Sequence, residues 1–181
     1  MMAAQLAHWE FRLAGSGGQG LITAGIILAE AAVASGLNAV QTQSYGPESR
    51  GGASRAEVII SSGEIDYPKV IRPDVLLVMT QQGADRYLPG LKDSGLLVAD
   101  EDLVKDIPPA SFRVVRAPIV RLAREEVGRE IVANIVALGV LVSLTEVVPV
   151  DILEEAVLKR VPRGTEDLNR RALRAGLGRG K

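Results

Sequence analysis

A strand, a glycine-rich turn and a helix follow one another between Phe11 and Ala29, and this stretch most limits what the chain can fold into. Residues 9–14 alternate apolar and polar side chains, which is typical of a half-buried strand. Apolar residues then recur at helical spacing from Leu21 until the stop at 35–36. Four glycines occupy the six-residue turn Gly15-Ser16-Gly17-Gly18-Gln19-Gly20.

This turn is a candidate for binding an anion. Glycine adopts positive φ and has no Cβ, so a ligand can approach the main chain closely. The helix that follows adds free N–H groups and roughly half a positive charge at its N-terminus, which favours phosphate or carboxylate. We therefore predict an anion- or nucleotide-binding turn made of Gly15, Ser16, Gly17, Gly18, Gln19 and Gly20.

A dinucleotide-binding enzyme is one reading of the same turn. The glycines fit the GxGxxG pattern, and residues 39–43 predict a second strand that completes a βαβ unit. A dinucleotide site usually has an acid about 20 residues after the glycines to bind the ribose hydroxyls. No Asp or Glu occurs between Glu30 and Glu48, so the sequence disfavours NAD or FAD.

A polar loop over residues 43–55 follows the second predicted strand. We expect it at the same edge of the sheet as the glycine turn, because ligands of open α/β sheets bind at the carboxyl ends of the strands. Stacking, hydrogen-bonding and phosphate-pairing groups are supplied there by Tyr45, Glu48, Arg50 and Arg55. The alternative is a solvated connection without function.

The remaining sequence predicts further strands and then a helical part. Strands are expected at 56–62, 75–79, 95–99 and 112–116, with a hairpin turn at 61–64 leading into 65–67. Helices are expected at 84–87, 119–127, 129–147, 152–161 after an Asp151 cap, and 165–175. Asn134 lies on an otherwise apolar helix and needs a polar partner.

These elements predict one α/β domain over residues 1–181. It is a three-layer Rossmann-like domain with a mostly parallel sheet, a β-hairpin insertion and a helical C-terminal part. We expect residues 176–181 to form a disordered tail.

Composition excludes several kinds of function. The net charge of −1 gives no indication of nucleic acid binding, and the absence of cysteine excludes disulfides, a cysteine nucleophile and cysteine-held iron–sulfur clusters. His8 alone cannot build a multi-histidine metal site, and residues 100–102 favour a solvated helix start over a metal site. No apolar run reaches membrane-spanning length, and we expect a cytoplasmic protein. We assign no catalytic and no metal-binding residue.

Several motifs resemble the gamma subunit of the 2-oxoacid:ferredoxin oxidoreductases. They are the glycine turn 15–20, the loop Tyr45-Gly46-Pro47-Glu48-Ser49-Arg50-Gly51-Gly52, and the later Asn134, Leu138-Gly139, Asn169, Ala172 and Gly176. The stretch Arg50-Gly51-Gly52-Ala53-Ser54-Arg55 is more similar to the 2-oxoglutarate type than to the pyruvate type, in which a proline tends to follow the arginine–glycine pair.

The resemblance implies a reaction and a division of labour. A 2-oxoacid and CoA give acyl-CoA and carbon dioxide, and two electrons pass to ferredoxin. Thiamine diphosphate with Mg²⁺ and the iron–sulfur clusters belong to alpha, beta or delta partners, and this chain binds no cofactor alone. It would contribute to CoA binding and assembly and be inactive by itself. A purely structural subunit and an independent nucleotide-binding enzyme are the alternatives.

Overall fold

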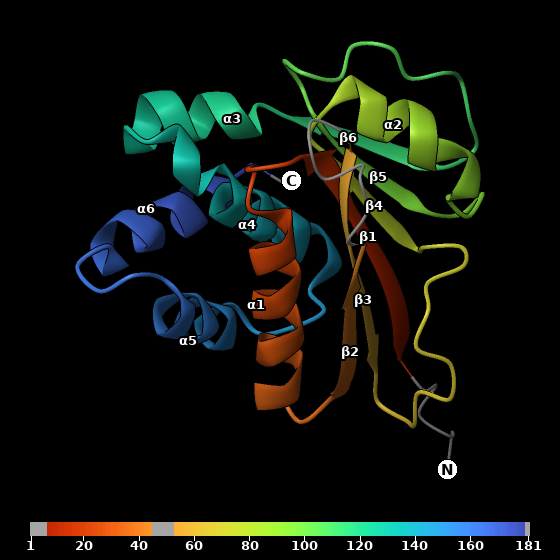
Figure 1. Cartoon of the computed structure of the whole chain (residues 1–181), viewed down its shortest axis with the longest axis horizontal. Coiled ribbons are helices and arrows are strands. Elements are labelled where there is room, and N and C mark those ends of the chain that lie inside the picture. Colours follow the sequence, from red (N-terminus) through yellow and green to blue (C-terminus); the bar gives the residue numbers. More distant parts are fainter. Residues whose placement is uncertain (1–6, 45–52, 180–181) are drawn as a thin grey trace.

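The computed structural model describes residues 7–44 and 53–179, which form a six-stranded sheet with helices on both faces (Figure 1). The strands are β1 (His8–Ser16), β2 (Asn38–Gln43), β3 (Ala53–Ser61), β4 (Val75–Val78), β5 (Leu96–Asp100) and β6 (Arg113–Ala117). The helices are α1 (Leu21–Ala34), α2 (Gln81–Tyr87), α3 (Ile119–Arg121), α4 (Ala133–Thr145), α5 (Val150–Arg160) and α6 (Glu166–Leu177). Single turns of tighter or wider helix are η2 (Leu88–Gly90), η3 (Leu122–Val127) and η4 (Glu130–Val132). The predicted three-layer α/β architecture is confirmed.

The strand order is β2-β3-β1-β4-β5-β6, and β1 pairs in parallel with β4 and antiparallel with β3. The predicted βαβ unit is therefore interrupted, because β3 lies between β1 and β2. Alternating side chains specify which face of a strand is buried but not which strand lies beside it. Helix α1 crosses β3 closely, and a Cβ added at Gly25 would lie 3.1 Å from the Cβ of Ala56.

The antiparallel insertion is the pair β2 and β3, which lies on one side of β1. The predicted hairpin at 61–64 is wrong, since residues 65–67 form no strand and belong to the connection from β3 to β4. Both edges of β3 are already paired, with β1 and with β2, so no edge remains for a further partner. The local turn signal was outweighed by this long-range pairing.

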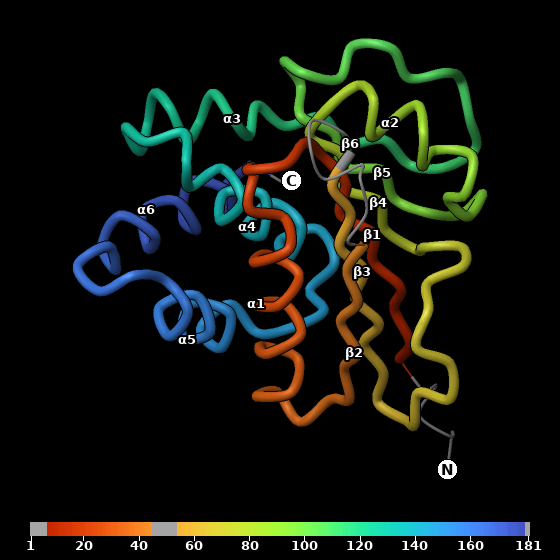
Figure 2. The backbone as a smooth tube through the Cα atoms, viewed as in Figure 1, coloured from red at the N-terminus to blue at the C-terminus, as the bar shows by residue number. Residues whose placement is uncertain are grey.

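The sheet separates a larger core from a smaller one. Helices α1, α4, α5 and α6 cover one face and α2 covers the other, as the ribbon and the backbone tube both show (Figures 1 and 2). Phe11 and Leu13 point into the larger core, whereas Ala14 points toward α2. Strand β4 is buried at all four positions, because Leu77 enters the larger core and Leu76 the smaller one. This explains its continuous apolar run.

The C-terminal part is helical as predicted, with different boundaries. The helix expected over 129–147 begins with η4 and continues as α4, in which the first ten residues are all buried. The helix expected at 152–161 begins at Val150, so Asp151 lies in its first turn and Pro149 occupies the N-cap. An acid in the first turn still complements the helix dipole.

Helix α6 packs so closely against α4 that glycine is required at the crossing. The Cα atoms of Gly139 and Gly176 face each other, and a Cβ added at Gly176 would overlap the carbonyl oxygen of Val136. Gly176 and Leu177 are therefore part of α6, which corrects the expected start of the disordered tail. Arg179 beyond the helix forms an ion pair with Glu126 at 2.6 Å. Residues 180–181 lie outside the described part.

The sequence predicted a solvated helix start at residues 100–102, and for Asp100 this prediction is wrong. Its side chain is fully buried at the end of β5, and its carboxylate accepts N–H bonds from Asp102 and Leu103 at 2.9 Å. The other carboxylate oxygen accepts the N–H of Val120 in α3, also at 2.9 Å. A buried carboxylate needs such partners, and the bond to Val120 connects the end of β5 to the start of the helical part.

Candidate functional site

The glycine turn leads from the carboxyl end of β1 directly into α1. Two of its glycines have positive φ, +87° at Gly18 and +74° at Gly20, which side-chain-bearing residues rarely adopt. Gln19 holds the turn in place: its Oε1 accepts the N–H of Ser16 at 2.8 Å, and its Nε2 donates to the carbonyl of Met79 at 3.3 Å. The turn is thus attached to the end of β4 as well as to β1.

Asn134 provides a second attachment, from the start of α4. Its Nδ2 donates to the carbonyl of Gly20 at 3.1 Å, and its Oδ1 accepts the N–H of Ile135 at 3.0 Å. The expectation that Asn134 needs a polar partner is confirmed. The approach is so close that a Cβ at Gly20 would lie 2.6 Å from Nδ2. Glycine at this position therefore serves both its φ and this contact.

The N-terminus of α1 behind the turn is electrostatically open. Helix α1 has 14 residues, begins after Gly20 without a side-chain cap, and has no acidic residue in its first turn. Its first N–H groups thus have neither an intrahelical acceptor nor a capping side chain. An anion placed over the turn would be attracted by these N–H groups and by the helix dipole. The chemistry proposed for residues 15–20 is consistent with this geometry.

A pocket of about 280 Å³ lies beside the turn. It is lined by Gly18, Gln19, Val120, Glu130, Ile131 and Ala133. Ile131 is 76% exposed although it is large and apolar. Glu130 binds the guanidinium of Arg124 at 2.7 Å, and this hydrogen bond and charge raise the pKa of Arg124 above its ordinary value. Four of the lining residues are missing from the prediction, because nothing local connects residues 120–133 to the glycine turn.

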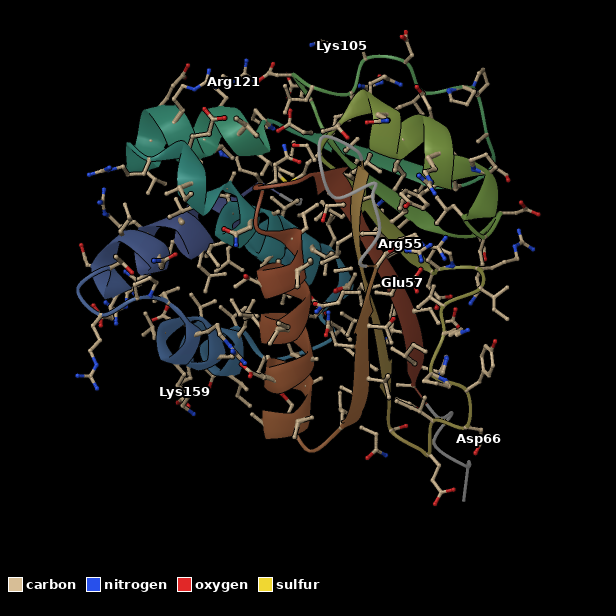
Figure 3. The ribbon with its side chains drawn as sticks, viewed as in Figure 1. Arg55, Glu57, Asp66, Lys105, Arg121 and Lys159 are labelled. Carbon is tan, nitrogen blue, oxygen red and sulfur yellow. The ribbon has the colours of Figure 1, made fainter. Side chains whose placement is uncertain are left out.

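Arg55 belongs to β3 and not to the polar loop in which the sequence placed it. It pairs with Ala14, two residues before the end of β1, so it does lie near the glycine turn along the strand. Its side chain is on the α2 face with Glu57, on the opposite side of the sheet from α1 (Figure 3). The Arg55 Nε is 3.6 Å from the Glu57 carboxylate. A ligand in contact with both Arg55 and the glycine turn must therefore extend around the end of the sheet, from one face to the other.

Tyr45, Glu48 and Arg50 lie outside the described residues. The register places Ala53, where β3 begins, opposite Ser16 at the end of β1. Residue 43, the end of β2, pairs with Ala56 at the same end of the sheet. The chain therefore leaves β2 and enters β3 at the end of the sheet where β1 leads into the glycine turn.

Two further observations concern residues 7–44 and 53–179. No group of three or more His, Cys, Asp or Glu side chains among them is arranged to hold a metal ion. The helices in this part are too short or too polar to cross a bilayer.

Comparison with known proteins identifies the family of this chain. Residues 10–178 match the family model described as pyruvate ferredoxin/flavodoxin oxidoreductase. The 2-oxoglutarate synthase subunit KorC of Methanocaldococcus jannaschii is 49% identical over 170 residues, which cover 92% of this chain and 91% of that protein.

Solved structures agree. The keto/oxoacid ferredoxin oxidoreductase gamma subunit of Geobacter sulfurreducens superposes with a TM-score of 0.86 at 50% identity, over 95% of this chain and 98% of that one. A chain of the 2-oxoglutarate:ferredoxin oxidoreductase of Magnetococcus marinus, solved with 2-oxoglutarate, coenzyme A and succinyl-CoA bound, shares the fold. Its TM-score is 0.86 at 22% identity, over 96% of this chain and 31% of that one. This chain therefore belongs to the pyruvate ferredoxin/flavodoxin oxidoreductase family and is a subunit of a 2-oxoacid:ferredoxin oxidoreductase.

Proposed function

We propose that the chain is the gamma subunit of a 2-oxoglutarate synthase. The complex would convert 2-oxoglutarate and CoA to succinyl-CoA and carbon dioxide and pass two electrons to ferredoxin. Two observations support 2-oxoglutarate as the substrate. The chain is 49% identical, over nearly its full length, to a 2-oxoglutarate synthase subunit, and its Arg50–Arg55 stretch contains no proline. The chain would be inactive alone, because residues 7–44 and 53–179 place no nucleophile with a base at the glycine turn and the sequence has no cysteine for a cluster.

Within the complex, the chain would bind the phosphates of CoA. The observation that carries this proposal is the uncapped N-terminus of α1 behind a turn that Gln19 and Asn134 hold in place. Main-chain N–H groups of residues 17–20 would face the pyrophosphate. Arg55 would pair with a phosphate from the α2 side of the same edge, and Tyr45, Glu48 and Arg50 remain proposed contacts.

The other cofactors would belong to partners. Iron–sulfur clusters need thiolate or comparable ligands, and this chain has no cysteine. The family to which the chain belongs implies that thiamine diphosphate with Mg²⁺ and the clusters would lie on alpha, beta and delta subunits, with ferredoxin as the electron acceptor. This chain's own part would be to bind and orient CoA.

The test is co-expression with the neighbouring open reading frames and purification through a tag on this chain. The purified complex is then assayed with 2-oxoglutarate, CoA and a viologen dye. We expect thiamine- and cluster-bearing subunits to co-purify and dye reduction to depend on CoA. Faster dye reduction with pyruvate than with 2-oxoglutarate would refute 2-oxoglutarate as the substrate. A chain that purifies alone and binds NAD or FAD in calorimetry would refute the subunit role.

The structural-subunit alternative is tested by Gly18→Val in the same complex. If the turn has only a structural role, the backbone strain of a side chain at φ +87° reduces the yield of assembled complex as much as the activity. If the turn binds CoA, the complex assembles and the KM for CoA rises. Size-exclusion chromatography and steady-state kinetics on one preparation distinguish these two results.

A further inference from the structure

Three arginines surround the ring of Tyr87, the last residue of α2. The guanidinium carbons of Arg12, Arg55 and Arg86 lie 5.5, 5.7 and 5.5 Å from the ring centroid. Distances below about 6 Å are typical of cation–π contacts. The residue itself is only 7% exposed, so these contacts are largely removed from water. The cluster lies on the α2 face of the sheet, close to the end of the strands that carries the glycine turn.

Arg12 is held by other groups as well as by the ring. Its Nε donates to Oε1 of Glu57 at 2.8 Å, and its Nη2 donates to the carbonyl of Val70 at 2.9 Å. Arg12 and Glu57 are each only 7% exposed and face each other across β1 and β3. A buried guanidinium and carboxylate satisfy each other in this way. Arg12 therefore has a structural role.

Arg55 differs from Arg12 in what holds it. Its Nε is 3.6 Å from the same Glu57 oxygen, which is beyond hydrogen-bond distance. Its side chain is 34% exposed, and to the residues described here its guanidinium donates no hydrogen bond. Among the described residues, Arg55 is held by the Tyr87 ring and by this longer ion pair with Glu57. Because one carboxylate serves two guanidinium groups, the three side chains together carry a net positive charge.

We infer that Tyr87 is a positioning residue for the anion contact of Arg55: its ring holds the guanidinium while the N–H donors remain available to a phosphate oxygen of CoA. This inference rests on the proposed function. An arginine that is free to rotate loses side-chain entropy when it binds an anion, whereas a guanidinium already held against a ring has lost part of it beforehand. The ring therefore raises affinity for CoA without touching it.

The test replaces Tyr87 by phenylalanine and by 3,4,5-trifluorophenylalanine in the assembled complex. Fluorination reduces the negative charge on the ring face and hardly changes the shape of the ring, so the core is preserved. We expect Tyr87→Phe to behave as the unaltered protein. Trifluorophenylalanine should raise the KM for CoA about fivefold, which corresponds to roughly 1 kcal/mol of cation–π energy, with kcat unchanged.

Controls separate this inference from the proposed CoA site. Trifluorophenylalanine at Phe112, which is packed against the same smaller core, should leave the KM unchanged. In an Arg55→Ala background, fluorination at position 87 should have no further effect. If Arg55→Ala raises the KM but fluorination does not, the inference about Tyr87 is wrong and the CoA site stands. If Arg55→Ala itself leaves the KM unchanged, the Arg55 contact is wrong and the inference fails with it.

Discussion

Replacing Gly18 by alanine tests whether the glycine turn binds phosphate, and Gly36→Ala at the other end of α1 is the control. Gly18 precedes α1 with φ +87°, and Gly36 follows α1 with φ +83°. A Cβ added at either position meets nothing within 4 Å. The two substitutions therefore cause the same backbone strain and no clash, but only one of them is at the proposed phosphate site.

The expected magnitudes follow from this difference. Alanine at positive φ costs about 1–2 kcal/mol of stability at each position. At Gly18 the new methyl group also occupies space over the turn and blocks close approach of a phosphate. Losing one hydrogen bond to a charged group costs about 1.5–3 kcal/mol, or roughly ten- to a hundredfold in affinity.

The assay is steady-state reduction of viologen by the complex, with CoA as the varied substrate. We expect Gly18→Ala to raise the KM for CoA at least tenfold and Gly36→Ala to leave it within twofold, while both lower the melting temperature by similar amounts. Equal KM values for the two variants would refute phosphate binding at the turn. A large loss of stability in Gly18→Ala alone would instead favour a purely structural role of the turn.

Three other substitutions test the support of the site. Asn134→Ala should cost about 1 kcal/mol and raise the KM for CoA, because the glycine turn loses a hydrogen bond; an unchanged KM would show that this bond is not needed. Gly176→Ala should prevent close packing of α6 on α4 and greatly lower the yield of folded protein, while Gly178→Ala, whose added Cβ has open space, should be neutral in thermal unfolding. Glu57→Gln leaves a buried guanidinium without its charge partner and should cost about 3–5 kcal/mol in denaturant unfolding, against about zero for Glu155→Gln in an exposed pair.

Local elements were predictable because their causes are local. The strand before the glycine turn, the helix after it and the buried strand at 75–78 were all predicted, since side-chain periodicity reports burial directly. Boundaries of helices in the C-terminal part were less accurate. The 3-10 turn η4 and the wider turn η3 share the periodicity of an α-helix closely enough to be read as one.

Long-range pairing was not predictable from the same patterns. The position of β3 between β1 and β2 removes the edge that a hairpin to residues 65–67 would need. The contact between Arg55 and Tyr87 likewise joins β3 to the end of α2, 32 residues further along the chain. Asn134 was the exception, because a polar side chain on an apolar helix signals a partner even when the partner is unknown.

The two attachments of the glycine turn have a consequence for the thermodynamics of binding. Gln19 and Asn134 fix the main chain between β1 and α1 before any ligand is present. A phosphate that binds there as proposed would meet donors that are already aligned, so little conformational entropy would be lost on association. The affinity of the turn would thus be determined partly by a side chain 114 residues away from its main-chain acceptor. Substitutions deep in the helical part would therefore weaken ligand binding without any contact to the ligand.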